Sequence, residues 1–244
     1  MALILHIETA TTVCSVALAE DGKLLSLREE NKGFTHAENI TLFIEAVLKE
    51  AGRKVTDLHA VAVSSGPGSY TGLRIGVSTA KGLCYALEIP LISVSTLKGM
   101  AYRFVEQLEK ETTETEQSSQ VLPFGKDLGW VCPMIDARRM EVFCAVYDED
   151  LNVIEAPFPK IIDENSFSEL LKEKKIFFFG DGAAKCKPVL SHQPNAVFLD
   201  DIFPSAASMA ILAAEKFLKK DFEDVALFEP FYGKEFVDSK KISS

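Results

Sequence analysis

The chain has 244 residues, of which 47% are hydrophobic and 25% charged, and its formal net charge at pH 7 is −10. This composition is that of a globular protein with a sizeable core and excludes a disordered or fibrous chain. The acidic charge disfavours a protein that binds nucleic acid or an anionic membrane by itself.

The five cysteines favour a reducing compartment. They are odd in number, widely spaced and embedded in apolar segments: Cys14, Cys84, Cys132, Cys144 and Cys186. We expect buried free thiols rather than disulfides. No CxxC pair or Cys/His cluster indicates zinc, so no zinc site is predicted. A strand pattern begins without a basic leader, and no apolar run reaches membrane-spanning length, which together predict a cytoplasmic protein without membrane contact.

Three consecutive antiparallel strands are predicted at the start of the chain. Residues 2–7 and 13–18 are apolar runs, and a hairpin turn at 20–23 leads into a third strand at 24–28. The turn Glu8–Thr12 separates the first two strands. Its hydroxyls and backbone amides could hold a phosphate.

A helix is predicted over residues 35–50. Thr35 and Glu38 have the spacing of a capping box, and Gly52 is expected to end the helix. The apolar positions recur at helical spacing and form one face: Ile40, Phe43, Ile44, Val47, Leu48 and Ala51.

The stretch Ser64–Gly76 separates a predicted strand at 59–63 from a second helix at 71–87. Gly66, Pro67 and Gly68 predict a tight turn that brings the first N–H groups of the helix to one point, where an anion could bind. The stretch lacks the Gly-Lys-Ser/Thr end of a Walker A loop and is not a Gly-x-Ser-x-Gly elbow. A turn that serves packing alone is the preferred reading, and a phosphate cradle is the alternative.

The second helix contains small residues four apart, Gly72, Gly76 and Ala80, so another element could approach its backbone closely. Each glycine inside this helix, Gly82 included, costs about 1 kcal/mol relative to alanine. Close packing is the expected compensation.

The remaining elements follow in order. We predict a strand at 90–94, a helix capped by Ser95 and ending near Glu109, strands at 130–136 and 141–147, a helix at 166–174, a strand at 175–179, a glycine turn at 180–182 and a last helix at 205–219. Residues 109–120 lack large apolar side chains and are predicted to be a mobile acidic linker.

Several polar residues could have either a catalytic or binding role or a purely structural one. Glu8 and Asp136 end strands and could coordinate Mg²⁺ or act as a base, although carboxylates at strand ends often only form turns. Of the histidines, His6 and His59 fit a core or sheet edge, and His36 fits a solvent-exposed first helical turn. The arginines Arg74, Arg138 and Arg139 could bind phosphate but are expected to solvate the surface.

Taken together, several segments resemble the TsaB (YeaZ) family, which acts in tRNA threonylcarbamoyladenosine synthesis. The resemblance is dense over residues 1–105 and patchier beyond. It is carried by Leu5–Thr9, Cys14–Leu18, His36, Ser64–Gly76, Lys81–Leu83 and Asp136–Phe143.

The resemblance implies an α/β, actin-like ATPase or ribonuclease-H-like fold, with two subdomains that each contain a mixed sheet flanked by helices. The expected parts are an N-terminal lobe at 1–108, the linker at 109–120, a C-terminal lobe at 121–204 and a tail at 221–244. The last helix, 205–220, is expected to pack back on the first lobe.

The resemblance also implies a protein that is not itself an enzyme. Catalytic TsaD-like relatives hold a metal through His-x-x-x-His, where this chain has Thr96 and Met100, unsuitable ligands for such a cation. The phosphate turn Asp-x-Gly-Thr/Ser reads Glu8-Thr-Ala10-Thr. We therefore expect no catalytic residue, metal or cofactor, and a vestigial nucleotide or anion site at Glu8, Thr9, Gly66, Pro67, Gly68, Ser69 and Asp136.

The implied role is that of a scaffold that binds TsaD, recruits the ATPase TsaE and supports the modification of tRNAs that read ANN codons. The tRNA would be met only through the complex, and a homodimer is expected when TsaD is absent. The implied interface lies on the first two helices, at Ile40, Phe43, Ile44, Val47, Leu48, Gly72, Gly76, Thr79 and Ala80. The alternative is that both helices simply cover their own sheet.

Two other functions are weighed against the scaffold. An ATP-dependent kinase or ATPase of the same fold would use Glu8, Gly66, Gly68 and Asp136. A glycoprotease-like peptidase is disfavoured, because the sequence offers no nucleophile–base pair and no metal pair.

Overall fold

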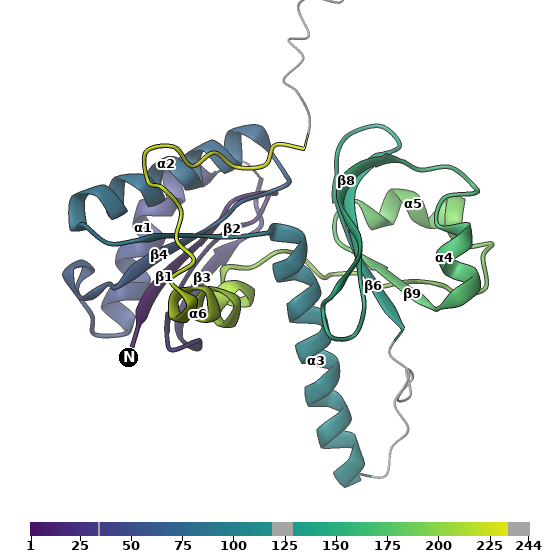
Figure 1. Ribbon diagram of the computed structural model, residues 1–244, viewed down its shortest axis with the longest axis horizontal. Helices are drawn as coiled ribbons and strands as arrows, with labels where there is room; N and C mark the ends of the chain where they lie inside the picture. The colour runs from purple at the N-terminus through teal and green to yellow at the C-terminus, as the bar shows by residue number, and fades with distance from the viewer. Residues whose placement is uncertain (34, 119–128, 234–244) are drawn as a thin grey trace, which may run out of the picture.

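A computed structural model describes residues 1–33, 35–118 and 129–233 (Figure 1). In this part of the chain the first sheet has the strand order β3-β2-β1-β4-β5. Its strands are β1 (Leu3–Glu8), β2 (Cys14–Glu20), β3 (Lys23–Glu30), β4 (Ala60–Ser64) and β5 (Leu91–Val94). The first three pair antiparallel, as the sequence predicts, and β4 and β5 run parallel to β1.

Helices cover both faces of the first sheet. One face carries α1 (His36–Glu50) and α2 (Tyr70–Leu87), with the 3-10 helix η1 (Val55–Asp57) between them. The other face carries η2 (Ala206–Met209) and α6 (Ala210–Lys219). The strands are buried on both sides, so Leu5 packs towards α1 and α2 while its neighbour Ile4 packs towards α6.

The second sheet repeats the topology of the first. Its order is β10-β9-β6-β7-β8, with antiparallel pairs β6–β7 and β7–β8 and parallel pairs β6–β9 and β9–β10. The elements are β6 (Trp130–Asp136), β7 (Glu141–Tyr147), β8 (Val153–Ile161), α4 (Ser168–Glu173), β9 (Ile176–Phe179), α5 (Ala183–Leu190) and β10 (Ala196–Phe198). The helix α3 (Thr96–Ser118) packs on one face, and α4 and α5 pack on the other.

Two mixed sheets of the same strand order, each flanked by helices, confirm the predicted fold class. The strands β8 and β10 were not predicted. Pro157 and Pro159 interrupt the strand signal in β8, and an edge strand tolerates them. β10 has only three residues, too few to show a period. We propose that the two sheets define the lobes expected at 1–108 and 121–204.

Two local predictions were wrong. The third helix continues to Ser118, so most of the segment predicted as an irregular linker is helical, because Glu, Lys and Gln form helices well without apolar neighbours. Residues 119–120 lie outside the described part. The side chain of Thr35 makes no capping bond to the backbone of α1. Its hydroxyl instead accepts a hydrogen bond from the amide of Asn39 over 3.0 Å.

The described residues after α6 pack against the first sheet and α2. Residues 220–233, which we call the strap, run from the end of α6 along the edge of the first sheet and across α2 (Figure 1). The tail predicted at 221–244 includes residues 221–233 of this strap. Residues 234–244 lie outside the described part.

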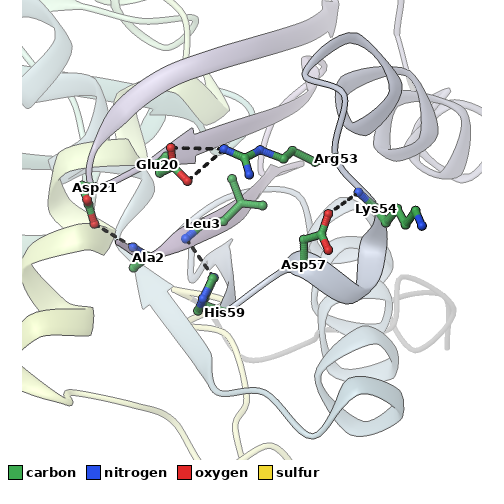
Figure 2. A network of polar contacts seen from close by, with 8 residues as sticks. All are labelled: Ala2, Leu3, Glu20, Asp21, Arg53, Lys54, Asp57 and His59. Atoms are coloured by element: carbon green, nitrogen blue, oxygen red, sulfur yellow. Dashed lines mark hydrogen bonds and ion pairs between the residues drawn. The ribbon is translucent and has the colours of Figure 1, made fainter.

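Polar contacts fix the end of the first sheet where β1 begins. Asp21 accepts the N–H of Ala2 over 2.7 Å, and the imidazole of His59 accepts the N–H of Leu3 over 3.2 Å (Figure 2). Arg53 pairs with Glu20 over 3.1 Å. These polar side chains at this end are therefore engaged within the chain, and β1 reaches Glu8 at the opposite end of the sheet.

All five cysteines are buried and unpaired, which confirms the predicted free thiols. Among the described helices, none combines the length and the apolar character needed to cross a bilayer.

Candidate functional site

Two turns meet where β1 and β4 end. The β1–β2 turn, Glu8 to Thr12, lies against the glycine turn that leads from β4 into α2. The N–H of Ser69 donates to the carbonyl oxygen of Ala10 over 2.7 Å, and the hydroxyl of Thr9 donates to the carbonyl oxygen of Gly72 over 2.9 Å. Six of the seven predicted vestigial residues, all except Asp136, belong to these two turns.

The glycines of this region serve close packing within the chain. A Cβ atom at Gly68 would overlap the carbonyl oxygen of Ala10, and a Cβ atom at Gly72 would overlap that of Thr9. A Cβ atom at Gly76 would overlap the hydroxyl of Thr9. The small-residue stripe therefore admits the chain's own β1–β2 turn. The prediction that Gly72 and Gly76 leave room for another subunit was wrong.

Within the chain, Ser69 caps the start of α2 and accepts the N–H groups of Gly72 and Leu73. The hydroxyl of Ser69 accepts the N–H of Gly72 over 3.3 Å and caps the helix, while the N–H of Ser69 itself is used by the β1–β2 turn. On the other side of the turn, Phe231 of the strap donates its N–H to Ser65 and lies against Gly66. Chain atoms thus occupy the approaches to the glycine turn, which favours the packing role over a phosphate cradle.

Glu8 is enclosed at the centre of this arrangement. Its carboxylate accepts the N–H of Ala10 over 2.7 Å, and its side chain is almost completely buried. Burial raises the pKa of Glu8 to about 7, because it outweighs the hydrogen bonds that the carboxylate accepts. Protonation therefore competes with metal binding near neutral pH.

Asp136 lies apart from this cluster in its hydrogen bonding. It pairs with Lys185 over 2.5 Å and accepts the N–H of Arg138 over 2.6 Å. Its own N–H donates to Asp181 over 3.0 Å, and burial raises the pKa of the Asp181 carboxyl. Within the described residues, no hydrogen bond or ion pair joins Asp136 to the Glu8 turn.

Two of the histidines, His36 and His6, are buried in the core. His36 was predicted to be solvent-exposed, but it is buried and its Nε2 lies 2.8 Å from the carbonyl oxygen of Thr11. It stands at the meeting of α1 with the β1–β2 turn, which explains the correction. His6 is fully buried in β1, where burial lowers its pKa to about 4. In the described part of the chain, no group of three or more His, Cys, Asp and Glu side chains is placed to hold a metal.

Most of the predicted partner residues lie inside the chain's own core. Ile40, Ile44, Val47 and Leu48 of α1 pack on the first sheet, and Ala80 of α2 joins them. Phe43 and Thr79 are half-buried. An apolar helical stripe marks the face that a helix buries, and here that face covers the sheet of the same chain.

The outward faces of α1 and α2 carry a different set of residues. Leu42 on α1 is 60% exposed and Tyr85 on α2 is 85% exposed. Exposed small residues follow α2 at four-residue spacing, at Ser78, Gly82 and Ala86, and a Cβ atom at Gly82 would meet no atom within 4 Å. We call these residues the outer face. Large apolar residues off the buried stripe were the sequence signal that could have identified it.

Comparisons with known proteins agree over nearly the whole chain. The family model for TsaD, tRNA N6-adenosine threonylcarbamoyltransferase, matches residues 31–237. The tRNA threonylcarbamoyladenosine biosynthesis protein TsaB of Escherichia coli K12 is 33% identical over 98% of this chain and 97% of its own. A tRNA N6-adenosine threonylcarbamoyltransferase of Halalkalibacterium halodurans is 37% identical over 44% of this chain and 36% of its own. The structure of YeaZ from Pseudomonas aeruginosa, 23% identical, superposes with a TM-score of 0.75 over 94% of this chain and 99% of that one.

Proposed function

The chain belongs to the TsaB family of tRNA threonylcarbamoyladenosine biosynthesis proteins, and from this premise we propose that it is a non-catalytic subunit of tRNA threonylcarbamoyladenosine biosynthesis. It would bind the catalytic TsaD of its own cell through the outer face of α1 and α2. The observation that carries the proposal is this outer face, since it exposes large apolar side chains and an unpacked helical glycine.

The condition of the glycine turn supports the absence of catalysis. The β1–β2 turn and the strap fill the approaches to Gly66 and Gly68, and Ala10 stands where phosphate-binding turns have a glycine. Thr96 and Met100, at the place of the family's metal ligands, are both buried. A kinase or ATPase would need an open glycine turn and accessible metal ligands, so the scaffold is the better-supported hypothesis.

Gly82 is the residue of the proposed docking face that contacts within the chain do not explain. A glycine inside a helix costs about 1 kcal/mol relative to alanine. Contacts within the chain account for Gly72 and Gly76, whereas the position of Gly82 is open. A partner helix that approaches the backbone along Ser78, Gly82 and Ala86 would supply the missing reason.

A docking face of two helices is of adequate size. A standard interface buries about 800 Å² on each partner, and apolar anchors near its centre contribute most of the affinity. Leu42 and Tyr85 are suited to be those anchors. Through the same complex the chain would recruit TsaE and meet tRNA. In the absence of TsaD, the same face would pair two copies of this chain.

Co-elution with TsaD tests the proposal. We expect Leu42→Arg and Tyr85→Asp to stay folded and to lose co-elution with TsaD in size-exclusion chromatography. The matched control is Leu218→Arg, because Leu218 is at least as exposed as Leu42 but lies on α6, on the opposite face of the sheet. The assignment is wrong if TsaD co-elutes with both folded outer-face variants as it does with the control.

A further inference from the structure

The strap adds itself to the free edge of the first sheet. β5 is the edge strand there, and the N–H of Glu223 donates to the carbonyl oxygen of Leu91 over 2.9 Å. The hydroxyl of Ser93 donates to the carboxylate of Glu223 over 2.5 Å. These two bonds fix the direction in which the strap continues towards α2.

The middle of the strap is held on α2. The ammonium group of Lys81 donates to the carbonyl oxygen of Ala226 over 3.0 Å. Val225 and Phe228 turn inward and pack against the core between α2 and the sheet. Leu227, between them, keeps its side chain in solvent.

The last described residues of the strap reach both sheets. Phe231 donates its N–H to the carbonyl oxygen of Ser65 over 2.8 Å. The ring centroid of Tyr232 lies 4.7 Å from that of Tyr70 at the start of α2. Gly233 then lies against the ring of Phe143, which belongs to β7 in the second sheet. A Cβ atom at Gly233 would overlap that ring.

The chain crosses between the two sheets covalently at α3 and again between β10 and η2 (Figure 1). The contact of Gly233 with Phe143 is a third link between the sheets. The residues just before it, Phe231 and Tyr232, are bound to the glycine turn and to the first turn of α2. Near these crossings, α3 packs on the second sheet, and Gly99 of α3 lies near Ser208 of η2. A contact elsewhere on the two sheets would further restrict their relative rotation.

We propose that residues 231–233 form a latch, which holds the two sheets in one relative orientation and covers the glycine turn. The latch is built from a backbone hydrogen bond, a ring contact and a glycine fitted to an aromatic face. It is independent of the outer face of α1 and α2, so its failure and the failure of the docking proposal are distinguishable.

Paired spin labels measure the relative orientation of the sheets. Thr56→Cys beside the first sheet and Glu173→Cys on α4 place one label at each, and both positions are exposed. The five native cysteines are buried, so the labels attach at the introduced thiols. The latch is opened in the full chain by Tyr232→Ala with Gly233→Leu, and Leu227→Ala is the matched control on the same strap.

We expect one narrow distance distribution in the parent and in Leu227→Ala, and a distribution at least twice as broad in the double variant. Amide hydrogens at Ser65, Gly66 and Gly68 should exchange at least tenfold faster in the double variant. If it is poorly folded, Tyr232→Ala alone should show the same changes in smaller size. An unchanged distance distribution in a folded variant overturns the latch, even if exchange at the glycine turn is faster.

Discussion

The hydroxyl of Thr9 donates a hydrogen bond to the carbonyl oxygen of Gly72 and fastens the β1–β2 turn to the first turn of α2. Both residues are buried, and the same hydroxyl stands where a side chain at Gly76 would lie. The turn and the helix therefore approach more closely than any residue other than glycine allows. The position of α2, and of its outer face, depends on this contact.

The two kinds of glycine on α2 should respond oppositely to alanine. Gly76→Ala gains helix propensity but forces a methyl group into Thr9, and overpacking of this kind costs about 1–3 kcal/mol. We expect a net loss of up to about 2 kcal/mol in the free energy of unfolding. Gly82→Ala meets no atom and should gain about 1 kcal/mol. Urea unfolding of the two variants measures both changes. Equal signs for the two variants would contradict the inward and outward assignment.

Arginine substitutions on α1 should separate folding from docking. Val47 is fully buried against the sheet, and Val47→Arg would bury an unpaired charge, at a cost of about 3–5 kcal/mol. We expect that variant to be insoluble or largely unfolded. Leu42→Arg should change the free energy of unfolding by less than about 0.5 kcal/mol. Thermal melts followed by circular dichroism decide this, and a folded Val47→Arg protein would contradict the packing of α1.

The sequence predicted the fold well because its signals are periodic. Buried strands such as β1 read as short apolar runs, and α1 and α2 show three–four spacing. The strand signal is weaker at the edges of the sheets, where a strand such as β8 contains proline. At residues 109–118 the polar composition led to the wrong prediction of an irregular linker. There the absence of apolar residues removed the packing signal, although the local helix propensity remained.

The residues of the site could be predicted from the sequence, but not which neighbours they contact. The glycine turn and Glu8 were identified together, and the structure joins them. Helical spacing places Gly82 on a different face of α2 from Gly72 and Gly76, but it could not show that Gly72 and Gly76 contact Thr9 whereas the position of Gly82 is open. Neither could it show that the strap returns to Ser65, because that contact joins residues far apart in the sequence.

The cysteines should be inert in the native protein. Burial raises the pKa of Cys14, Cys84 and Cys186 to about 11 and that of Cys132 well above its ordinary value, so the thiolate is scarce at pH 8. We expect a thiol reagent such as dithionitrobenzoate to label less than one cysteine per chain within minutes at pH 8. In guanidinium chloride it should label all five. Rapid labelling of the folded chain would contradict the burial.

Two buried groups should give opposing slopes in the dependence of stability on pH. The pKa of Glu8 is about 7 in the folded chain and about 4.5 in the unfolded chain. The free energy of unfolding therefore falls as pH rises from about 4.5 to about 7, because the folded chain holds the proton more tightly. Unfolded His6 takes up a proton near pH 6.5, whereas the folded residue does so only near 4, so stability falls as pH falls through that window. Each contribution amounts to about 3 kcal/mol. In the parent protein the two largely cancel between pH 4.5 and 6.5.

Glu8→Gln should expose the slope of His6. The amide oxygen of glutamine can still accept the N–H of Ala10, but the group no longer titrates. At pH 7.5 the variant should therefore be more stable than the parent, by up to about 3 kcal/mol, because the parent must ionise a buried carboxyl. The difference should shrink to zero as pH falls towards 4.5. Urea unfolding of both proteins at half-unit pH steps measures it, and parallel curves would show that Glu8 ionises as easily in the folded chain as in the unfolded one.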